Sequence, residues 1–541
     1  MQYTKQTLGN IVDQKCAEFA ARESMVFASD NSRYTYSEFK VLYDSLAKAL
    51  LHLGIQKGQH IAIMSVNSPY WLAMQVAVSK IGAVLVCLNT ACSAKELEYE
   101  LNHSDSVAVI LAGGKSKTPF LTKFQTICPE IQHSKPGNLS SAALPLIKTV
   151  ITDETVASPG VYTLKELARA GKVMPDSLLN TIQGTLSADD IVNIQYTSGT
   201  TGKPKAVMTS QYSIVNNALV CGKNMNYSPE DRLLLCLPLF HVIGCVLSGI
   251  LGILHGCTLV IVECFHTEEV LCFLEKERCT AINAVPTMFH FLLNSPHLHI
   301  EKLPALKKGF IAGSHCPPGL MTELMEKMHI TEMSNVYGQT EGIAITQSLE
   351  SDSLEHRMHT IGRAVEGVEA KIIDSKTHTI LPAGMCGELC VKTEYAMKGY
   401  YKNEDATKKT LDEEGWLHTG DLAEMDEEGY ISLLGRIKEI IIRGGENISP
   451  IEIENTLKDC HGVQDAAAVG VPDAVFGEEI CAFIIRKDPL ITEDELSTFA
   501  SLHLAKYKLP KYYRFVNELP VTSSGKIKRT FLKEQVINEY R

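Results

Sequence analysis

Cysteine pairs with metal-binding spacing are missing from this chain. The sequence has 541 residues and 16 cysteines but no Cys-x-x-Cys pair; the closest neighbours are Cys386 with Cys390 and Cys87 with Cys92. We therefore expect no structural zinc site. Many cysteines lie in apolar runs, as Cys236 does, where a free thiol behaves as a small hydrophobic side chain in a reducing compartment. This usage favours a cytoplasmic location.

An excess of positive charge is also missing. The formal net charge is −12 and the sequence pI is about 5.9, which argues against a general nucleic-acid-binding protein. Residues 1–7 lack the apolar core of a secretory signal peptide, and residues 538–541 are not a known retention or peroxisomal address. We expect a globular protein without a nucleic-acid partner.

No uninterrupted apolar run has the length of a membrane span. The most apolar stretch, residues 242–262, approaches that length, but His255 and several glycines interrupt it. A buried helix that leads into a strand at residues 258–262 explains the stretch better. We therefore expect no transmembrane segment.

The order of apolar segments indicates parallel sheets covered by helices. Short strands are expected at residues 61–64 and 84–88, with a helix at residues 71–81 between them, and this alternation is typical of an α/β fold. Residues 130–159 contain the breakers Lys135-Pro136-Gly137-Asn138. We interpret this segment as a surface excursion with an exposed turn and expect no catalytic residue in it.

Two domains of unequal size are expected, because the chain is longer than one hydrophobic core usually serves. The clearest boundary follows the strand-like residues 430–434. We predict a large domain at residues 1–436 and a small α+β domain at residues 437–541. No internal repeat or low-complexity tract is present.

The most informative segment, Tyr196 to Lys205, holds four aliphatic hydroxyls, two glycines and two lysines in ten residues. It follows a strand-like run at residues 190–196, and its glycines let backbone N–H groups approach an anion, so the segment suits a polyphosphate. A plain surface loop is the simplest alternative. A P-loop is excluded, because Thr197 stands at the position of that motif's first glycine and Pro204 follows Lys203.

Four further segments follow in order along the chain, and each alone could be an ordinary turn, strand or surface charge. They are Tyr337-Gly338-Gln339-Thr340-Glu341, residues 415–421 ending in Asp421, residues 435–448 with Arg436, Lys438, Gly444 and Gly445, and residues 520–528 with Lys526. Together the five segments resemble the acyl-adenylate-forming (AMP-binding) superfamily of acyl-CoA synthetases, fatty-acid–CoA ligases, luciferases and peptide-synthetase adenylation domains. The resemblance covers nearly the whole chain.

The resemblance implies a fold and a set of small-molecule partners. The fold would have a large N-terminal domain of parallel-rich sheets with helices plus a small barrel, followed by a small mobile α+β domain. The co-substrates would be ATP and coenzyme A, and the cofactor would be Mg²⁺.

Catalytic and ATP-binding roles are implied as well. Lys526, Thr340 and Glu341 would be catalytic. Glu341 would also bind Mg²⁺, since a carboxylate is a hard oxygen ligand, and Thr200 is a second candidate ligand. The residues implied to bind ATP are Thr197, Ser198, Gly199, Thr200, Thr201, Gly202, Lys203, Lys205, Gly313, Ser314, Tyr337, Gly338, Asp421 and Arg436.

The nucleoside would lie against two of these residues. The ring of Tyr337 can stack on adenine, and the carboxylate of Asp421 can accept two hydrogen bonds from the ribose hydroxyls. By the same resemblance Arg436 also contacts the nucleotide.

The remaining implied roles concern the hinge, the thiol and the acid. Lys438 would be the hinge about which the small domain turns, and pantetheine would pass Gly444 and Gly445. No cationic residue is evident around the implied acyl pocket, which favours an aliphatic or aromatic monocarboxylic acid. That pocket would include His241, Val242 and Gly244.

We therefore expect an ATP-dependent, AMP-forming ligase that activates a carboxylic acid as its acyl-adenylate and transfers it to coenzyme A, as in fatty acid metabolism. One alternative is an adenylation enzyme that loads the pantetheine of a carrier protein. Others are a luciferase-type oxygenase and a non-catalytic nucleotide-binding homologue, and intact Lys526, Glu341 and Asp421 argue against the latter. The sequence does not determine the acid's chain length or the oligomeric state.

Overall fold

The structure is a computed structural model of the chain. It describes residues 3–114, 120–153, 159–197, 204–314, 316–444, 446–473, 475–521 and 527–539. Several residues with predicted functions lie outside the described residues, namely Ser198, Gly199, Thr200, Thr201, Gly202, Lys203, Gly445 and Lys526.

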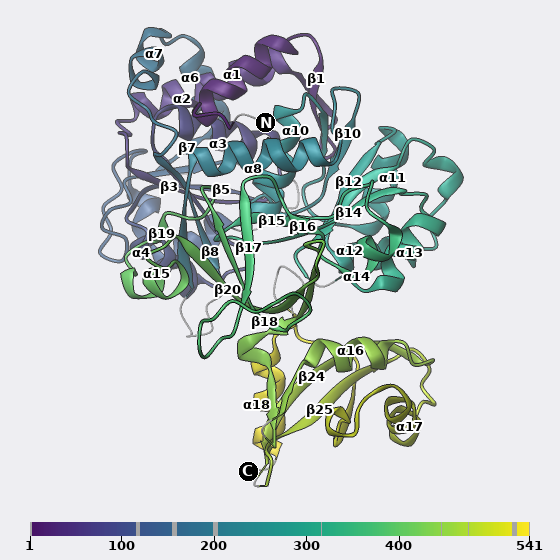
Figure 1. The fold of residues 1–541 in the computed structure, drawn as a ribbon. Helices are drawn as coiled ribbons and strands as arrows, with labels where there is room; N and C mark the ends of the chain where they lie inside the picture. The colour runs from purple at the N-terminus through teal and green to yellow at the C-terminus, as the bar shows by residue number, and fades with distance from the viewer. Residues whose placement is uncertain are drawn as a thin grey trace.

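Two large, mostly parallel sheets form the body of the protein (Figure 1). The first has nine strands in the order β16 (Arg363–Ala364), β15 (Ile343–Gln347), β14 (Glu332–Gln339), β13 (Lys308–Ala312), β12 (Ala281–Asn283), β10 (Arg232–Leu235), β11 (Thr258–Ile261), β1 (Glu23–Phe27) and β2 (Ser32–Thr35). The second has eight strands in the order β19 (Gly399–Tyr400), β9 (Lys205–Ser210), β8 (Ile191–Thr197), β4 (Val84–Cys87), β3 (His60–Ser65), β5 (Ser106–Ala112), β6 (Thr149–Thr152) and β7 (Val161–Thr163). The predicted α/β class with parallel-rich sheets is confirmed.

Helices fill the space between the two sheets and cover their outer faces. One continuous core contains Ile61 of β3, Leu233 of β10 and Trp71 of α3, so α3 packs between the sheets. The helices of the body are α1 (Leu8–Glu18), α2 (Tyr36–His52), α3 (Pro69–Lys80), α4 (Ala94–His103), α5 (Phe120–Ile127), α6 (Leu164–Lys172), α7 (Ser177–Gln183), α8 (Gln211–Asn224), α11 (Thr267–Lys276), α12 (Pro286–Leu293), α13 (Pro318–Lys327) and α14 (Leu354–His359), with short 3₁₀ turns η1 (Pro129–His133) and η3 (Ile300–Lys302).

The apolar stretch at residues 242–262 is a buried helix followed by a strand, as predicted. It contains α9 (Val242–Gly244), a π-helical segment η2 (Cys245–Ile250), α10 (Leu251–Leu254) and β11. Across the part of the chain that the structure describes, no helix is both long and apolar enough to cross a membrane.

The interpretation of residues 130–159 as a surface excursion is wrong in part. β6 lies within this segment, pairs in parallel with β5, and is buried along its whole length. All four of its residues are β-branched, which suits a strand that is covered on both faces. A run of four residues is too short for its periodicity to indicate a strand. The breakers at residues 135–138 led instead to the interpretation as an exposed turn.

A third, smaller sheet is antiparallel and follows the two large sheets in the chain. Its order is β17 (Val368–Ile373), β18 (Gly387–Thr393), β20 (Trp416–Met425) and β21 (Ile431–Arg436), and α15 (Glu404–Thr410) lies between β18 and β20 in sequence. This sheet takes the place of the small barrel that the resemblance implies.

The C-terminal part of the chain forms a separate body, drawn in yellow-green in Figure 1. Its sheet contains β23 (Glu446–Ile448), β22 (Ile441–Arg443), β25 (Gly477–Arg486), β24 (Val463–Asp473) and β26 (Tyr512–Val516), accompanied by η4 (Ile437–Glu439), α16 (Pro450–Lys458), α17 (Glu493–His503), η5 (Lys506–Lys508) and α18 (Arg529–Glu539). The chain changes sheet between β21 and β22, and the boundary predicted after residue 436 falls in this interval.

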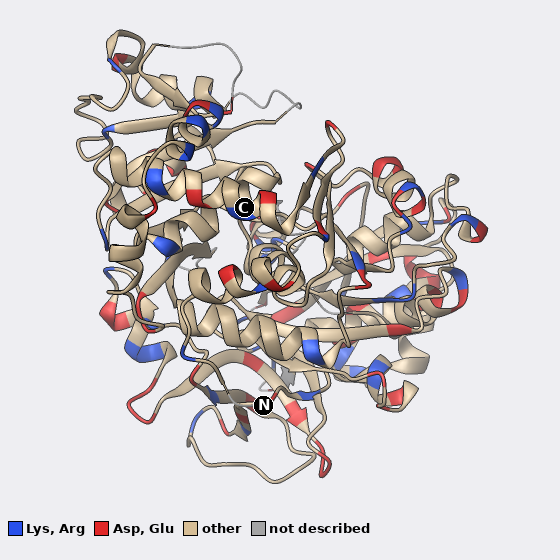
Figure 2. Ribbon diagram, turned by 90° about the horizontal axis from the view of Figure 1, so that it is seen from above, with Lys and Arg blue, Asp and Glu red and all other residues tan. Residues whose placement is uncertain are grey.

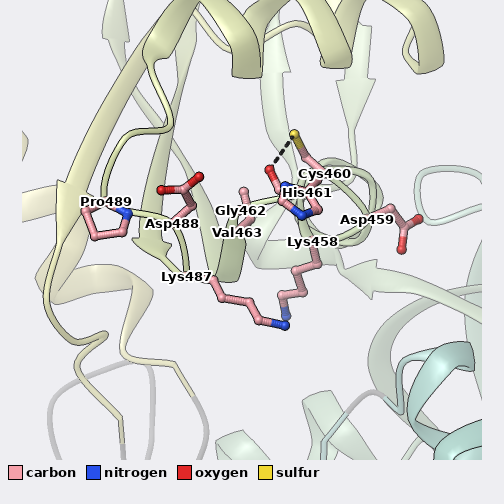
Figure 3. A pocket seen from close by; sticks show the side chains of 9 residues that line it. All are labelled: Lys458, Asp459, Cys460, His461, Gly462, Val463, Lys487, Asp488 and Pro489. Atoms are coloured by element: carbon pink, nitrogen blue, oxygen red, sulfur yellow. Dashed lines mark hydrogen bonds between the residues drawn. The ribbon is translucent and has the colours of Figure 1, made fainter.

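The small domain carries a cavity of about 490 Å³ on its surface (Figure 3). Residues 458–463 and 487–489 line it, and Lys458 forms an ion pair with Asp465 at 2.9 Å. None of the five segments of the sequence pattern contributes to it.

Acidic and basic residues are interspersed over the whole ribbon (Figure 2).

Arg529 anchors the last helix of the small domain. Its Nη1 lies 2.6 Å from Oε1 of buried Glu454, and its Nε lies 2.9 Å from Glu439 in η4. The carboxylate of Glu454 also accepts the N–H of Ala468 at 2.7 Å. The pair therefore ties α18 to α16, β24 and the connection between the domains.

Replacing Arg529 with alanine should destabilise the small domain by about 3–5 kcal/mol, because Glu454 would remain buried without its cation. Differential scanning calorimetry should show an earlier unfolding transition. Lys533→Ala is the matched control, since Lys533 pairs with Glu478 at 2.6 Å but is 39% exposed, and such pairs contribute about 0–1 kcal/mol. Equal shifts in the two variants would contradict this account.

Candidate active site

The carboxylate of Asp421 joins three of the sequence segments. Asp421 on β20 stands directly opposite Arg436 on β21, and the Arg436 Nε lies 3.1 Å from its Oδ1. The hydroxyl of Tyr337 donates to Oδ2 at 2.6 Å, and Nε2 of Gln339 donates to the same oxygen at 2.8 Å. The acid is only 4% exposed, so these donors replace the water it would otherwise bind.

Tyr337 stays protonated in this arrangement. Burial, together with the neighbouring charge of Asp421, raises the pKa of the phenol well above its ordinary value. The phenol therefore acts as a hydrogen-bond donor to the carboxylate. Gln339 extends the contact, because its Nε2 also donates to the carbonyl of Thr419 at 2.8 Å.

Gly338 is required by the close approach of two strands. β14 and β15 pair with a register shift at Tyr337 and Gly338, and a Cβ on Gly338 would lie 1.6 Å from the carbonyl oxygen of Ile343. Ile343 itself has φ of 58°, which is rare for a β-branched residue. The hairpin that presents the Tyr337–Glu341 segment is therefore tight and strained.

A second cluster surrounds Glu341, just beyond the end of β14. The hydroxyl of Tyr400 donates to Oε1 of Glu341 at 2.7 Å. The ammonium of Lys205 lies 4.5 Å from the centre of the Tyr400 ring. Burial lowers the pKa of Lys205, Glu341 opposes this effect, and Lys438 adds to it. Glu341, Lys205 and Lys438, from three different segments, are thus close in space, and half-buried Thr340 lies beside Glu341 in the turn.

The described ends of the first segment lie side by side. Thr197 of β8 is paired with Lys205 of β9, and its Oγ1 donates to the Lys205 carbonyl at 3.4 Å. The predicted grip residues 198–203 lie outside the described residues. On the other side of the strand, the hydroxyl of Tyr196 donates to the carbonyl of Glu100 at 3.1 Å and lies 3.0 Å from Nδ1 of His103.

The predicted acyl pocket lies where β8, α9 and the end of β13 meet. His241 immediately precedes α9, which begins at Val242, and its ring centre is 4.4 Å from that of Phe240. A Cβ on Gly244 would lie 2.2 Å from the carbonyl oxygen of Pro238, so the helix starts against the preceding turn. Gln195 of β8 fixes this turn by donating to the carbonyl of Phe240 at 3.2 Å.

Gly313 and Ser314 follow β13 and border the same region. Gly313 has φ of 88°, and a Cβ there would lie 3.0 Å from Val285 and 3.5 Å from Ile243. The neighbours of Gly313 in this region are therefore apolar.

The predicted hinge and thiol residues lie in the connection and the small domain. Lys438 is in η4. Gly444 has φ of 59°, and its N–H donates to the carbonyl of Phe476 at 2.8 Å.

The flanks of the fifth segment are also described. Val521 and Ile527 form an antiparallel bridge. The pKa of Glu96 on α4 is lowered chiefly by hydrogen bonds from Ser93, with smaller effects of Lys123 and Lys528, so Lys528, two positions after Lys526, lies near the large domain.

Two residues at the site were not identified from the sequence. Gln339 belongs to the recognised segment, but nothing in its spacing indicated the contact with Asp421. Tyr400 lies 59 positions from its partner Glu341 and outside all five segments. Only the fold brings it there, through the pairing of β19 with β9 beside Lys205.

The two-sheet body, the small C-terminal domain and the charged side chains that distant segments bring together are consistent with a nucleotide-binding enzyme. The AMP-binding enzyme family matches residues 12–401, and the AMP-binding enzyme C-terminal domain matches residues 452–526. The chain belongs to this family. It is an acid–thiol ligase of the AMP-forming acyl-CoA synthetase type.

Relatives of known name span nearly the whole chain. YngI of Bacillus subtilis (strain 168), whose name places it among the acyl-CoA synthetases, is 40% identical over 99% of this chain and 98% of its own length. The mitochondrial medium-chain acyl-CoA ligase ACSF2 of Rattus norvegicus is 35% identical over 98% of this chain and 87% of its own. The structure of ATP-bound MatB from Rhodopseudomonas palustris superposes with a TM-score of 0.86 at 26% identity, covering 99% of this chain and 100% of that one.

Glu100 should make stability fall with increasing pH. Burial, with a smaller contribution from Glu96, raises its pKa from 4.5 to about 8. The folded protein then holds a proton that the unfolded chain loses above its ordinary pKa, so stability declines between about pH 4.5 and about pH 8. Glu100→Gln removes the titrating carboxyl group and with it the loss of stability at high pH. The difference in Tm between the variant and wild type should therefore be at least about 2 °C larger near pH 9 than near pH 5.

The matched control is Glu98→Gln on the same helix, which should leave the pH dependence of Tm unchanged. Thermal unfolding followed by circular dichroism at both pH values provides the measurement. If Glu100→Gln changed Tm equally at the two pH values, the proton would not be held at Glu100.

Proposed function

We propose that this enzyme activates a medium-chain aliphatic monocarboxylic acid and transfers it to coenzyme A. The observation that carries the proposal is the convergence of Asp421, Arg436, Glu341 and Lys205, from four distant segments, on one site. The apolar surroundings of Gly313 support an uncharged acyl chain. The chain length is supported by the name of the relative ACSF2, a medium-chain ligase.

In this proposal the nucleoside binds at Asp421, with adenine against the ring of Tyr337 and beside Gly338. A carboxylate has about four acceptor positions, and donors from Tyr337, Gln339 and Arg436 use three of them. Two ribose hydroxyls would therefore displace one donor. Arg436 is the one free to move, because its side chain is 48% exposed and it precedes the hinge.

The polyphosphate would lie toward Lys205 and Glu341. The proposed grip consists of Thr197 and residues 198–203, with Thr340, Gly313 and Ser314 near the α-phosphate. Glu341 fits a Mg²⁺ ligand, because it is a hard carboxylate held in place by Tyr400, and Thr200 is the second candidate. Bound there, Mg²⁺ would supply positive charge for the oxygens of the departing pyrophosphate.

The first half-reaction requires a carboxylate to attack the α-phosphorus of ATP, and both reactants are anions. Lys526 is the proposed cation that bridges them, forming the acyl-adenylate as pyrophosphate leaves. Turning about Lys438 would then replace Lys526 with Gly444 and Gly445. The CoA thiolate attacks the acyl carbon, AMP leaves, and the thioester forms.

The acyl end would enter between α9 and β13. His241 is the proposed gate of the acyl pocket, with Val242 and Gly244 behind it. The proposed compartment is the cytoplasm, supported by the free cysteines of the described chain, most of which are buried.

An acid panel tests the proposal. Pyrophosphate release should be fastest with octanoate or decanoate, slower with acetate, palmitate and benzoate, and slowest with malonate, whose second carboxylate the apolar pocket would leave unpaired. Free CoA should increase turnover, and a phosphopantetheinylated carrier protein should not. Lys526→Ala should lower the octanoate-dependent rate by about 10²–10³-fold.

Lys528→Ala is the matched control for Lys526, and it should retain most of the rate. Malonate as the best acid would contradict the proposed acyl pocket. Preference for the carrier protein over CoA would contradict the proposed acceptor, and a fully active Lys526→Ala would remove this residue from the mechanism.

A further inference from the structure

A cluster of three potential metal ligands, which does not include Glu341, lies on the small antiparallel sheet. Glu388 and Cys390 are on β18 and His418 is on β20, where Cys390 and His418 stand directly opposite each other. The Cys390 Sγ lies 3.4 Å from Nδ1 of His418, and Oε2 of Glu388 lies 3.2 Å from the same nitrogen. All three ligand atoms lie within 4.8 Å of one another.

The two distances to Nδ1 of His418 are close to those between ligands of a tetrahedral zinc ion. Ligands at the usual Zn–N, Zn–O and Zn–S distances are about 3.3–3.7 Å from one another in tetrahedral geometry. A sulfur, an imidazole nitrogen and a carboxylate oxygen together favour Zn²⁺ over Mg²⁺ or Ca²⁺, which prefer all-oxygen sites. Cys390 and Glu388 are buried, whereas the His418 side chain is 21% exposed, so an ion can enter past the histidine.

The groups around the cluster orient its ligands. Oδ2 of Asp412 lies 3.6 Å from Nε2 of His418, on the far side of the ring from the cluster. Asp412 is itself fixed by the N–H groups of Glu414 and Trp416 at 2.9 and 2.8 Å. A carboxylate behind the imidazole is the arrangement found around metal-bound histidines, where it fixes which nitrogen faces the metal.

We propose that Glu388, Cys390 and His418 bind one Zn²⁺, with water as the fourth ligand. The thiol of Cys390 would release its proton to solvent on binding. The lack of Cys-x-x-Cys pairs led us to expect no structural zinc site, and this proposal departs from that expectation. The ligands come from two strands that β pairing brings together, so their spacing in sequence carries no signature.

The proposed zinc site is connected to the nucleotide site through the backbone. Oε1 of Glu388 accepts the N–H of Gly420 at 3.1 Å, next to Asp421. Thr419 donates to the carbonyl of Leu389 at 2.7 Å. The register between β18 and β20 shifts between Glu388 and Cys390. Zn²⁺ would bind one ligand on each side of this shift. Binding should therefore stabilise the segment that carries Asp421.

Cobalt and zinc titrations of the chelator-treated full-length enzyme test this proposal. Co²⁺ should bind with a thiolate-to-metal charge-transfer band in the near ultraviolet, and about one equivalent of Zn²⁺ should remove the band. Excess Mg²⁺ should not. Zn²⁺ should also raise Tm, because it binds the folded state.

Cys390→Ala should lose the charge-transfer band, weaken Zn²⁺ affinity by more than about tenfold and abolish the Tm increase. The matched control is Cys386→Ser, an exposed cysteine four positions away, which should behave as wild type. His418→Gln is a second ligand variant should Cys390→Ala unfold. Wild-type enzyme that binds neither metal, or a Cys390→Ala enzyme that keeps the band, would overturn the proposal.

Discussion

The arrangement of the site depends on one buried carboxylate. Asp421 is 4% exposed, and its charge is offset by donors from β14 and β21. A buried charge is costly unless it is paired and hydrogen-bonded, so the nine-stranded sheet and the small antiparallel sheet are held in one relative position. The partner Arg436 is the last residue before the connection to the small domain. The same carboxylate thus links the body of the protein to the start of the connection between the domains.

Those parts of the fold and site that depend on local sequence could be predicted. The strands at residues 61–64, 84–88 and 190–196 match β3, β4 and β8, because short apolar runs between turns have few other solutions. The five segments could be recognised because their chemistry is contained within short stretches of sequence. The contacts of Asp421, Glu341 and Lys205 bring four of the five segments together.

The parts that depend on contacts between distant residues could not be predicted. Tyr400 reaches Glu341 only because β19 pairs with β9. The strand β6 is recognisable only once its neighbour β5 is in place. Glu388, Cys390 and His418 form a cluster only through the pairing of β18 with β20. The π-helical turns at Cys245–Ile250 also have no sequence signal, because an apolar run of this kind is typical of any buried helix.

The central claim is that Asp421 and the end of β14 form one nucleotide-binding unit. A double-mutant cycle with Tyr337→Phe and Asp421→Asn tests it most directly, with ATP affinity measured by isothermal titration calorimetry. If the two groups act together, their effects should be non-additive, with a coupling energy of about 0.5–3 kcal/mol. Additive effects, within about 0.3 kcal/mol, would contradict the account, because the segments would then contribute to ATP binding independently.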